Sequence, residues 1–153
     1  MMIAYVHWGT EGKIHYGQDQ TEIADLCVKA GADAVIGGHP HRLQGVEFIK
    51  NVPVAYSVGN FWFSTGKLYT TIAQIQIDDS GSLKLRMIPC IQDSLTPSIL
   101  TEKNRSKHFI IIWQTSPIMW ELMRTDSFIR IKMSKTGSFS LCLYVRKALW
   151  TVF

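Results

Sequence analysis

The sequence has few cysteines and no long hydrophobic run, and each shortage excludes a class of protein. Its three cysteines, Cys27, Cys90 and Cys142, are widely spaced and form neither a zinc-binding nor a redox pair. It has no signal-peptide pattern and no run of about 20 apolar residues, since Met1 and Met2 lead directly into a strand-like segment. Taken as it stands, the sequence predicts a soluble chain located in the cytoplasm.

Glycine and acidic residues are scarce in the last third of the chain. Residues 1–100 hold nine Asp and Glu, seven Lys and Arg, and ten of the eleven glycines. Residues 101–153 hold three Asp and Glu against nine Lys and Arg. A basic tail can bind nucleic acid or a membrane, but this one shows neither a helical stripe nor interleaved aromatic and basic residues, so no nucleic-acid partner is predicted. The 46% hydrophobic content and the length of 153 residues are typical of one globular domain.

Residues 3–36 are predicted to form a strand, a helix and a second strand. Ile3–Val6 and Ala34–Ile36 are short apolar runs typical of buried strands. A helix between them would make the two strands parallel, with a right-handed crossover. Two hairpins are predicted further along, one from Val46–Ile49 and Val54–Ser57, the other from residues 72–77 and 83–88 around the turn Asp78–Gly81.

The predicted helix has its own start, face and end. Asp19 and Glu22 have the spacing of a capping box, which marks the first turn. Gly31 is placed to end the helix. The residues expected to face the core are those with the spacing of one helical face, namely Ile23, Leu26, Cys27 and Ala30.

Both strands of this unit run into histidine. His7 follows the first strand, and Gly37-Gly38-His39-Pro40-His41 follows the second. Ligands of α/β proteins bind beyond the carboxyl ends of the strands, so three imidazoles should meet at one edge. The two glycines are expected to let the backbone turn, and the proline to fix one φ angle between the histidines. Imidazole suits Zn, Mn, Fe or Ni, whose coordination carboxylates would complete. For each histidine taken alone, a structural role is the alternative.

Three sequence blocks occur in order: His7-Trp8-Gly9-Thr10-Glu11, then residues 30–41, then Tyr56-Ser57-Val58-Gly59-Asn60-Phe61. With these blocks the chain resembles the CapA family of bacterial poly-γ-glutamate capsule biosynthesis proteins over about residues 3–100. The resemblance implies an α/β fold, the C-terminal portion of a calcineurin-like metallophosphoesterase sandwich. Within it, a βαβ unit would be followed by β-hairpins and an irregular tail.

The resemblance also implies a site with divalent metal ions, Mn, Zn or Fe, which is dinuclear in a complete domain. By this likeness His7 and His39 would bind one metal ion and His41 the other. Two such ions can clamp a phosphoryl or amide oxygen and activate a bridging water.

Three further residues gain roles from the same resemblance. Glu11 and Asn60 are the candidate catalytic residues, Asn60 by orienting the site from its loop. Trp8 is the candidate substrate-binding residue. The alternatives are a solvated loop carboxylate for Glu11, a turn residue for Asn60 and a packing aromatic for Trp8.

The chain also departs from the family pattern. Motifs containing Gly-Asp and Asn-Asn-His, which supply the bridging carboxylate and further ligands, have no counterpart before Met1. Without them we expect at most weak mononuclear binding, an exposed sheet edge and a truncated, inactive chain.

Three functional interpretations stay open at this stage. The first is a CapA-like capsule biosynthesis protein whose full-length relatives are metal-dependent hydrolases. The second is a non-enzymatic component that handles or exports the polymer, and the third is an inactive fragment of a disrupted gene. The resemblance implies an anionic polymer, poly-γ-glutamate, and membrane capsule-synthesis proteins as partners. Full-length relatives are expected to be anchored at the cell envelope.

The tail has a separate interpretation. Met and Trp each have one codon, so a reading frame moved by one base must turn Met119-Trp120 into Val and Trp120-Glu121 into Gly. With suitable synonymous codons, residues 114–126 then yield the closing segment typical of the family. Residues 101–153 are therefore predicted to be out-of-frame translation, and the alternative is a genuine, divergent tail.

Overall fold

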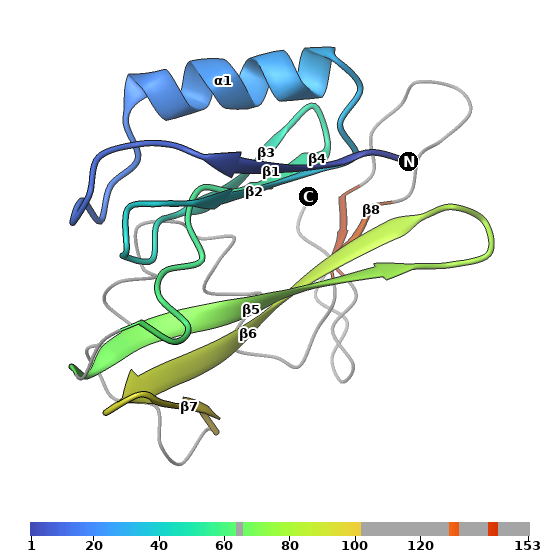
Figure 1. Ribbon diagram of the computed structural model, residues 1–153. Helices are drawn as coiled ribbons and strands as arrows, with labels where there is room; N and C mark the ends of the chain where they lie inside the picture. The colour runs from blue at the N-terminus through green and yellow to red at the C-terminus, as the bar shows by residue number, and fades with distance from the viewer. Residues whose placement is uncertain (64–65, 102–128, 132–140, 144–153) are drawn as a thin grey trace.

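The computed structural model describes residues 1–63, 66–101, 129–131 and 141–143. One helix, a mixed four-stranded sheet and an antiparallel sheet form three layers in this order (Figure 1). The helix covers one face of the mixed sheet, and the antiparallel sheet packs against the other face. The predicted α/β class, a partial sandwich of a βαβ unit and hairpins, is confirmed.

The first sheet contains the predicted strand-helix-strand unit. Its strand order is β1-β2-β4-β3, with β1, β2 and β4 parallel and β3 antiparallel to β4. The helix α1 connects β1 to β2. The bounds of these elements are Ile3–His7 for β1, Gln18–Lys29 for α1, Ala34–Gly38 for β2, Val46–Ile49 for β3 and Val52–Ala55 for β4.

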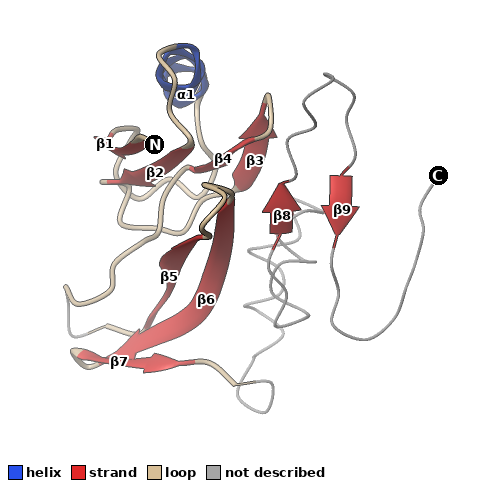
Figure 2. Cartoon of the chain, turned by 90° about the vertical axis from the view of Figure 1, so that its right-hand side faces the viewer, coloured by secondary structure: helices blue, strands red, loops and turns tan. Residues whose placement is uncertain are grey.

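The second sheet is built on the long hairpin of β5 (Leu68–Ile77) and β6 (Leu83–Asp93). The two strands pair from Leu68 opposite Gln92 to Ile77 opposite Leu83, which confirms the predicted hairpin. Three strands were not predicted: β7 (Thr96–Ile99), β8 (Ile129–Ile131) and β9 (Leu141–Leu143). Both β7 and β8 pair with β6, and β9 extends the sheet from β8 (Figure 2).

The turn between β3 and β4 is shorter than predicted. Lys50 and Asn51 alone form it, both with positive φ angles, 48° and 71°. Positive φ at both central residues defines the type I′ turn, whose twist matches that of the flanking strands. Val52 and Pro53 therefore belong to β4, paired with Ile49 and Phe48.

Two hydrophobic cores lie on the two faces of the first sheet. The core under α1 contains Trp8, Ala24, Ala32, Val35, Val54 and Tyr56. The core between the sheets contains Ile36, Leu43, Val46, Ala55, Leu85, Met87 and Leu100. Since strand residues alternate between faces, neighbours such as Val54 and Ala55 serve opposite cores. The strand β2 is thus buried on both of its faces, whereas β1 is partly exposed.

The predicted face of the helix is wrong for Ile23, Leu26 and Ala30, whereas Cys27 packs against the core under α1 as predicted. Leu26 is 62% exposed and Ile23 38%, whereas Ala24 and Gln20 are buried. Ala24 is small enough to bring α1 close to the sheet, and the buried amide of Gln20 is satisfied because it donates to Gln44 Oε1 at 2.8 Å. Periodicity counts apolar residues and so misses a contact made by a small residue and a paired amide.

The ends of α1 agree with the sequence more closely. The helix begins at Gln18 with Gly17 as N-cap, and the side chain of Gln20, rather than Glu22, accepts from the N–H of Gly17 at 3.2 Å. Gly31 ends the helix as predicted. Its φ angle is 96°, and its N–H donates to the carbonyl of Val28 at 3.1 Å.

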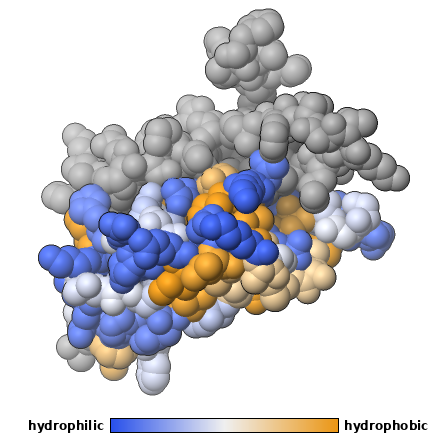
Figure 3. All heavy atoms as spheres, turned by 90° about the horizontal axis from the view of Figure 1, so that it is seen from above, coloured by the Kyte–Doolittle hydropathy of each residue, from blue (hydrophilic) through white to orange (hydrophobic). Residues whose placement is uncertain are grey.

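Apolar side chains remain exposed on the side of the helix and of β1. Among the described strands, β1 pairs with β2 alone, and Ile3 is 45% exposed. Seen from the helix side, a hydrophobic band crosses an otherwise hydrophilic surface (Figure 3). The expected exposed sheet edge is therefore present at β1 in the described residues.

In the described part of the chain, no helix is both long enough and apolar enough to span a membrane.

The proposed reading-frame change concerns residues 101–153, most of which lie outside the described residues, as does the apolar run at residues 109–113. The division of the chain at residue 100 stays a prediction.

Leu85→Ala and Leu26→Ala make the same chemical change at a buried and an exposed position. Leu85 is 3% exposed between the two sheets, and Leu26 is 62% exposed on α1. Leu85→Ala should lower the free energy of unfolding by about 3 kcal/mol, since it removes buried methyl groups and leaves a cavity. Leu26→Ala should change it by about 0.5 kcal/mol or less. Urea denaturation followed by circular dichroism measures both, and equal losses would contradict the placement of α1.

Candidate metal centre

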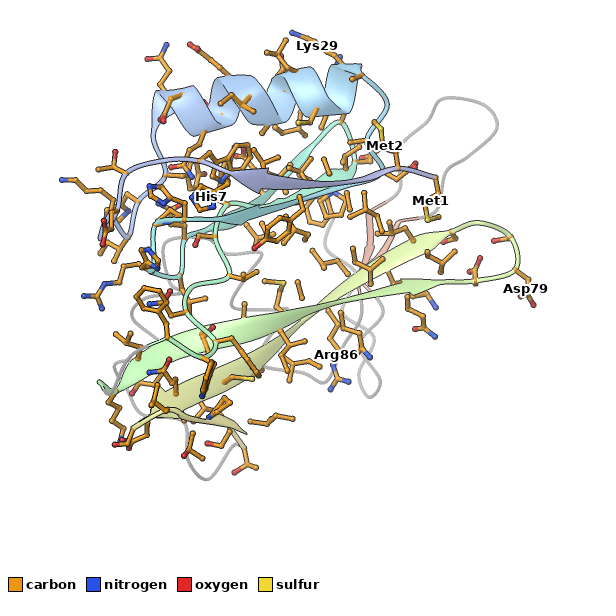
Figure 4. The ribbon with its side chains drawn as sticks, in the orientation of Figure 1. Met1, Met2, His7, Lys29, Asp79 and Arg86 are labelled. Carbon is orange, nitrogen blue, oxygen red and sulfur yellow. The ribbon has the colours of Figure 1, made fainter. Side chains whose placement is uncertain are left out.

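Parallel pairing of β1 and β2 brings the first two histidines together. His7, at the end of β1, is paired with Gly38, and the N–H of Trp8 donates to the carbonyl of Gly38 at 3.2 Å. His39 follows directly, and the ring centroids of His7 and His39 lie 4.5 Å apart. Figure 4 shows His7 at the carboxyl end of β1. The predicted meeting of histidines at this sheet edge is therefore present for these two.

The turn that carries His39 and His41 has an unusual backbone. Their φ angles are 94° and 58°, in the left-handed region that side chains disfavour. Pro40 between them is buried, and its carbonyl accepts from the N–H of Gly12 at 2.8 Å. Such strain persists only where the surroundings hold it, and it is typical of functional sites. The ring centroids of His39 and His41 lie 5.9 Å apart.

Gly37 and Gly38 have a different role from the one predicted. Both lie within β2, and the histidines rather than the glycines adopt the positive φ angles. A Cβ atom at Gly37 would lie 2.1 Å from the carbonyl oxygen of Tyr56 and 2.3 Å from Nε1 of Trp8. Glycine is thus required at position 37 because other groups approach its backbone closely.

Asn60 and Phe63 contact His41 from a loop that follows β4. Oδ1 of Asn60 lies 2.7 Å from Nδ1 of His41, and Asn60 is buried. The ring of Phe63 lies against the imidazole, with centroids 4.6 Å apart. His7, His39 and His41 are called the histidine cluster from here on. Asn60, a candidate site residue, contacts this cluster through His41.

Trp8 and Glu11 lie in different surroundings. Trp8 is 5% exposed, and its indole N–H donates to the carbonyl of Tyr56 at 2.7 Å. This geometry is that of a packing aromatic, and a role in substrate binding stays a prediction. Glu11 is exposed and precedes Gly12, whose N–H donates to the turn between His39 and His41. The described structure places Glu11 beside that turn without assigning it a catalytic role.

The loop from β1 to α1 is fixed by buried polar groups. Tyr16 stacks on Tyr56 with ring centroids 3.8 Å apart, and the hydroxyl of Tyr56 donates to Glu47 at 2.5 Å. Burial is the main cause that raises the pKa of Tyr56, and the hydrogen bond to Glu47 is the second cause. The amide of Gln44 donates to the carbonyls of Lys13 and His15, each at 3.2 Å. The loop that carries Glu11 is therefore anchored near its C-terminal end.

The donor set of the cluster consists of imidazoles. Within the described ranges, no group of three or more His, Cys, Asp or Glu side chains is close enough together to form a metal-binding group. Three imidazoles suit one Zn, Mn or Fe ion, whereas a two-metal centre needs carboxylates to balance charge and bridge the ions. The described positions of these side chains therefore form neither a mononuclear nor a dinuclear metal site, and metal binding by the three imidazoles stays a prediction.

Some residues at the site were not predicted. The sequence signal for Phe63 is the aromatic run Phe61-Trp62-Phe63 directly after Asn60. Gln92, which bonds to this loop from the second sheet, has no local signal, because it lies 29 residues from Phe63. The Tyr16–Tyr56–Glu47 contacts likewise join segments that are far apart in the sequence.

Residues 1–65 match the family model described as bacterial capsule synthesis protein PGA_cap. This part of the chain is therefore similar to that capsule synthesis family. The matched part contains the three histidines, Trp8, Glu11 and Asn60. The predicted resemblance to CapA proteins is thereby confirmed.

Curated relatives extend the likeness over more of the chain. The capsule biosynthesis protein CapA of Bacillus anthracis is 29% identical over 140 residues, covering 88% of the chain and 34% of that protein. The PGA biosynthesis protein CapA of Bacillus subtilis (strain 168) is 26% identical over 127 residues, covering 80% of the chain and 33% of that protein. An uncharacterized protein of Sinorhizobium fredii, y4sH, is 49% identical over 41 residues, covering 27% of the chain and 9% of that protein.

Two facts follow from these coverages. The chain spans about a third of the length of the two CapA relatives. Because the alignment with the Bacillus anthracis protein covers 88% of the chain, it extends beyond residue 101. The reading-frame change predicted for residues 101–153 is not tested by this alignment and stays a prediction.

Gly37→Ala tests the close approach beneath the histidine turn. The added methyl group meets the Tyr56 carbonyl at 2.1 Å, so the variant should lose about 3 kcal/mol of unfolding free energy or fail to fold. Gly12→Ala is the control, since it meets nothing within 4 Å but has a φ angle of 77°. That control should lose only the cost of the left-handed conformation, about 1 kcal/mol. Thermal and urea denaturation measure both, and a fully stable Gly37→Ala protein would contradict the geometry.

Proposed function

We propose that this chain is the histidine-bearing part of a CapA-like poly-γ-glutamate capsule biosynthesis protein, and that His7, His39 and His41 bind one divalent metal ion. The observation that supports it most is the placement of three imidazoles at the carboxyl ends of two neighbouring parallel strands, where α/β proteins build their sites. The family match over residues 1–65 includes all three.

The contact between Asn60 and His41 supports a ligand role for that histidine. When Nδ1 carries the proton it donates to Oδ1 of Asn60, at 2.7 Å, and Nε2 keeps its lone pair. Metal-binding histidines almost always donate their other ring N–H in this way, which fixes tautomer and ring orientation. Asn60 is then a residue that orients a ligand.

The chemistry of the donor set limits what this chain does alone. A bound divalent ion would polarise an oxygen of the substrate or activate a water. In the described residues no group of three or more His, Cys, Asp or Glu side chains is arranged to hold a metal ion, so no carboxylate completes the histidine set. We therefore propose that hydrolysis belongs to longer relatives and that this chain is inactive as a hydrolase.

A donor set made of imidazoles also favours a second candidate function, a non-enzymatic role in handling or exporting the polymer. A single metal ion held by neutral imidazoles keeps its positive charge, which attracts the carboxylates of an anionic polymer such as poly-γ-glutamate. Membrane capsule-synthesis proteins, and a location at the cell envelope, would be the partners and setting of that role.

Metal binding by the cluster is tested with Co²⁺, whose visible absorption reports the ligands. The wild-type chain should bind one Co²⁺, and His39→Ala should weaken binding at least tenfold, because His39 lies between the other two imidazoles. His15→Ala is the matched control, since His15 is exposed and outside the cluster. If both variants bind like the wild type, the histidines are structural and the proposal fails.

Polymer handling is tested with fluorescently labelled poly-γ-glutamate. With Zn²⁺ or Mn²⁺ present, fluorescence anisotropy should rise on addition of the chain, and chelation or His39→Ala should abolish the rise. Gel filtration of the same samples should show polymer of unchanged length. Shortened polymer would contradict the inactive chain and favour hydrolysis, whereas absence of binding would contradict polymer handling.

A further inference from the structure

We infer that Gln92, on the second sheet, is a positioning residue for His41 and acts through the loop between Asn60 and Gly66. This inference deepens the proposed function, on which it rests, by identifying what holds one of the three metal ligands in place. Residues 64 and 65 of this loop lie outside the described part of the chain, and the contacts used below come from the residues on either side.

Gln92 bonds to both sides of the loop. Its Oε1 accepts from the backbone N–H of Phe63 at 2.9 Å, and its Nε2 donates to the carbonyl of Gly66 at 3.0 Å. The side chain belongs to β6 and is fully buried, with 0% exposure. A buried amide with partners on both of its polar atoms is fixed in orientation, because losing either bond would leave a polar group unsatisfied.

The loop contacts His41 at two points. Asn60 is hydrogen bonded to the imidazole at 2.7 Å, and the Phe63 ring lies against it at a centroid distance of 4.6 Å and an interplanar angle of 32°. Gln92 accepts a hydrogen bond from Phe63, and Phe63 contacts the His41 imidazole, so a single residue links Gln92 to that imidazole. Gln92 itself does not touch the histidine cluster in any described contact.

Hydrophobic burial does not hold this part of the loop. Phe61, Trp62 and Phe63 are 43%, 68% and 63% exposed. Side chains that remain this exposed contribute little of the burial energy that fixes a core residue. The hydrogen bond from the backbone N–H of Phe63 to Gln92 thus restrains the backbone that carries the aromatic ring beside His41.

Gln92→Met is the direct test, because methionine has similar length and no group that can replace either hydrogen bond. Thr71→Val is the matched control: Thr71 is also buried on the second sheet, and its hydroxyl donates to the carbonyl of Ile88, away from the loop. Gln92→Glu is a second variant that keeps an oxygen for the Phe63 N–H, for use if Gln92→Met does not fold.

Two readouts are taken on the full chain. One is the position of the His41 ring resonances in the metal-free protein, which depend on the Phe63 ring current. The other is Co²⁺ affinity with its visible spectrum. Gln92→Met should shift the His41 resonances, weaken Co²⁺ binding about tenfold and alter the spectrum. Thr71→Val should change neither readout, and Gln92→Glu should shift the resonances less than Gln92→Met.

The outcomes separate this inference from the function on which it rests. Unchanged His41 resonances in Gln92→Met, or equal shifts in Thr71→Val, would overturn the positioning role whether or not Co²⁺ binds. Shifted resonances in a chain that binds no Co²⁺ would support the positioning of His41 and overturn the metal function. Shifted resonances together with weakened Co²⁺ binding, both absent from the control, are the result we expect.

Discussion

The candidate site depends on one register, the parallel pairing of β1 with β2 that sets His7 opposite Gly38. A shift of one residue would send every side chain of β1 to the other face of the sheet. The imidazole of His7 would then lose its contact with the imidazole of His39. The indole N–H of Trp8 would lose its hydrogen bond to the carbonyl of Tyr56. The register is kept because β2 is buried throughout its length, between the core under α1 and the core between the sheets. The packing that keeps this register therefore also fixes the relative positions of His7 and His39.

The second sheet completes the surroundings of that site. Its Leu85 and Met87 fill the core beneath Ile36 and Val46, while Gln92 reaches the loop beside His41. The cluster thus has two supports of different kinds. Strand pairing and a close backbone approach at Gly37 hold His7 and His39, and hydrogen bonds from a loop hold His41. A polymer or a metal ion would meet a surface whose strained turn is fixed from both sheets.

The parts that could be predicted from the sequence are those with local signals. The apolar runs ending in His7 and before His39 predicted two strands and their shared edge. The family resemblance carried in part by residues 56–61 implied a place at the site for Asn60, which contacts His41. The helix face was wrong because Ala24 and a paired Gln20 make the contact that Leu26 was expected to make. Gln92 could not be found, since its bond to Phe63 joins residues with no common period or motif. The positive φ angles of His39 and His41 are not signalled by any local sequence pattern, although histidine adopts such angles more often than most residues do.

We propose that the imidazoles of His7, His39 and His41 share one metal ion. X-ray absorption spectroscopy of the Zn²⁺-loaded chain tests it most directly, because it counts the imidazole nitrogens around the ion. The expected result is three imidazole nitrogens at about 2.0–2.1 Å from the ion, with oxygen completing the shell. One imidazole or none, or coordination by sulfur, would show that His7, His39 and His41 do not form a site.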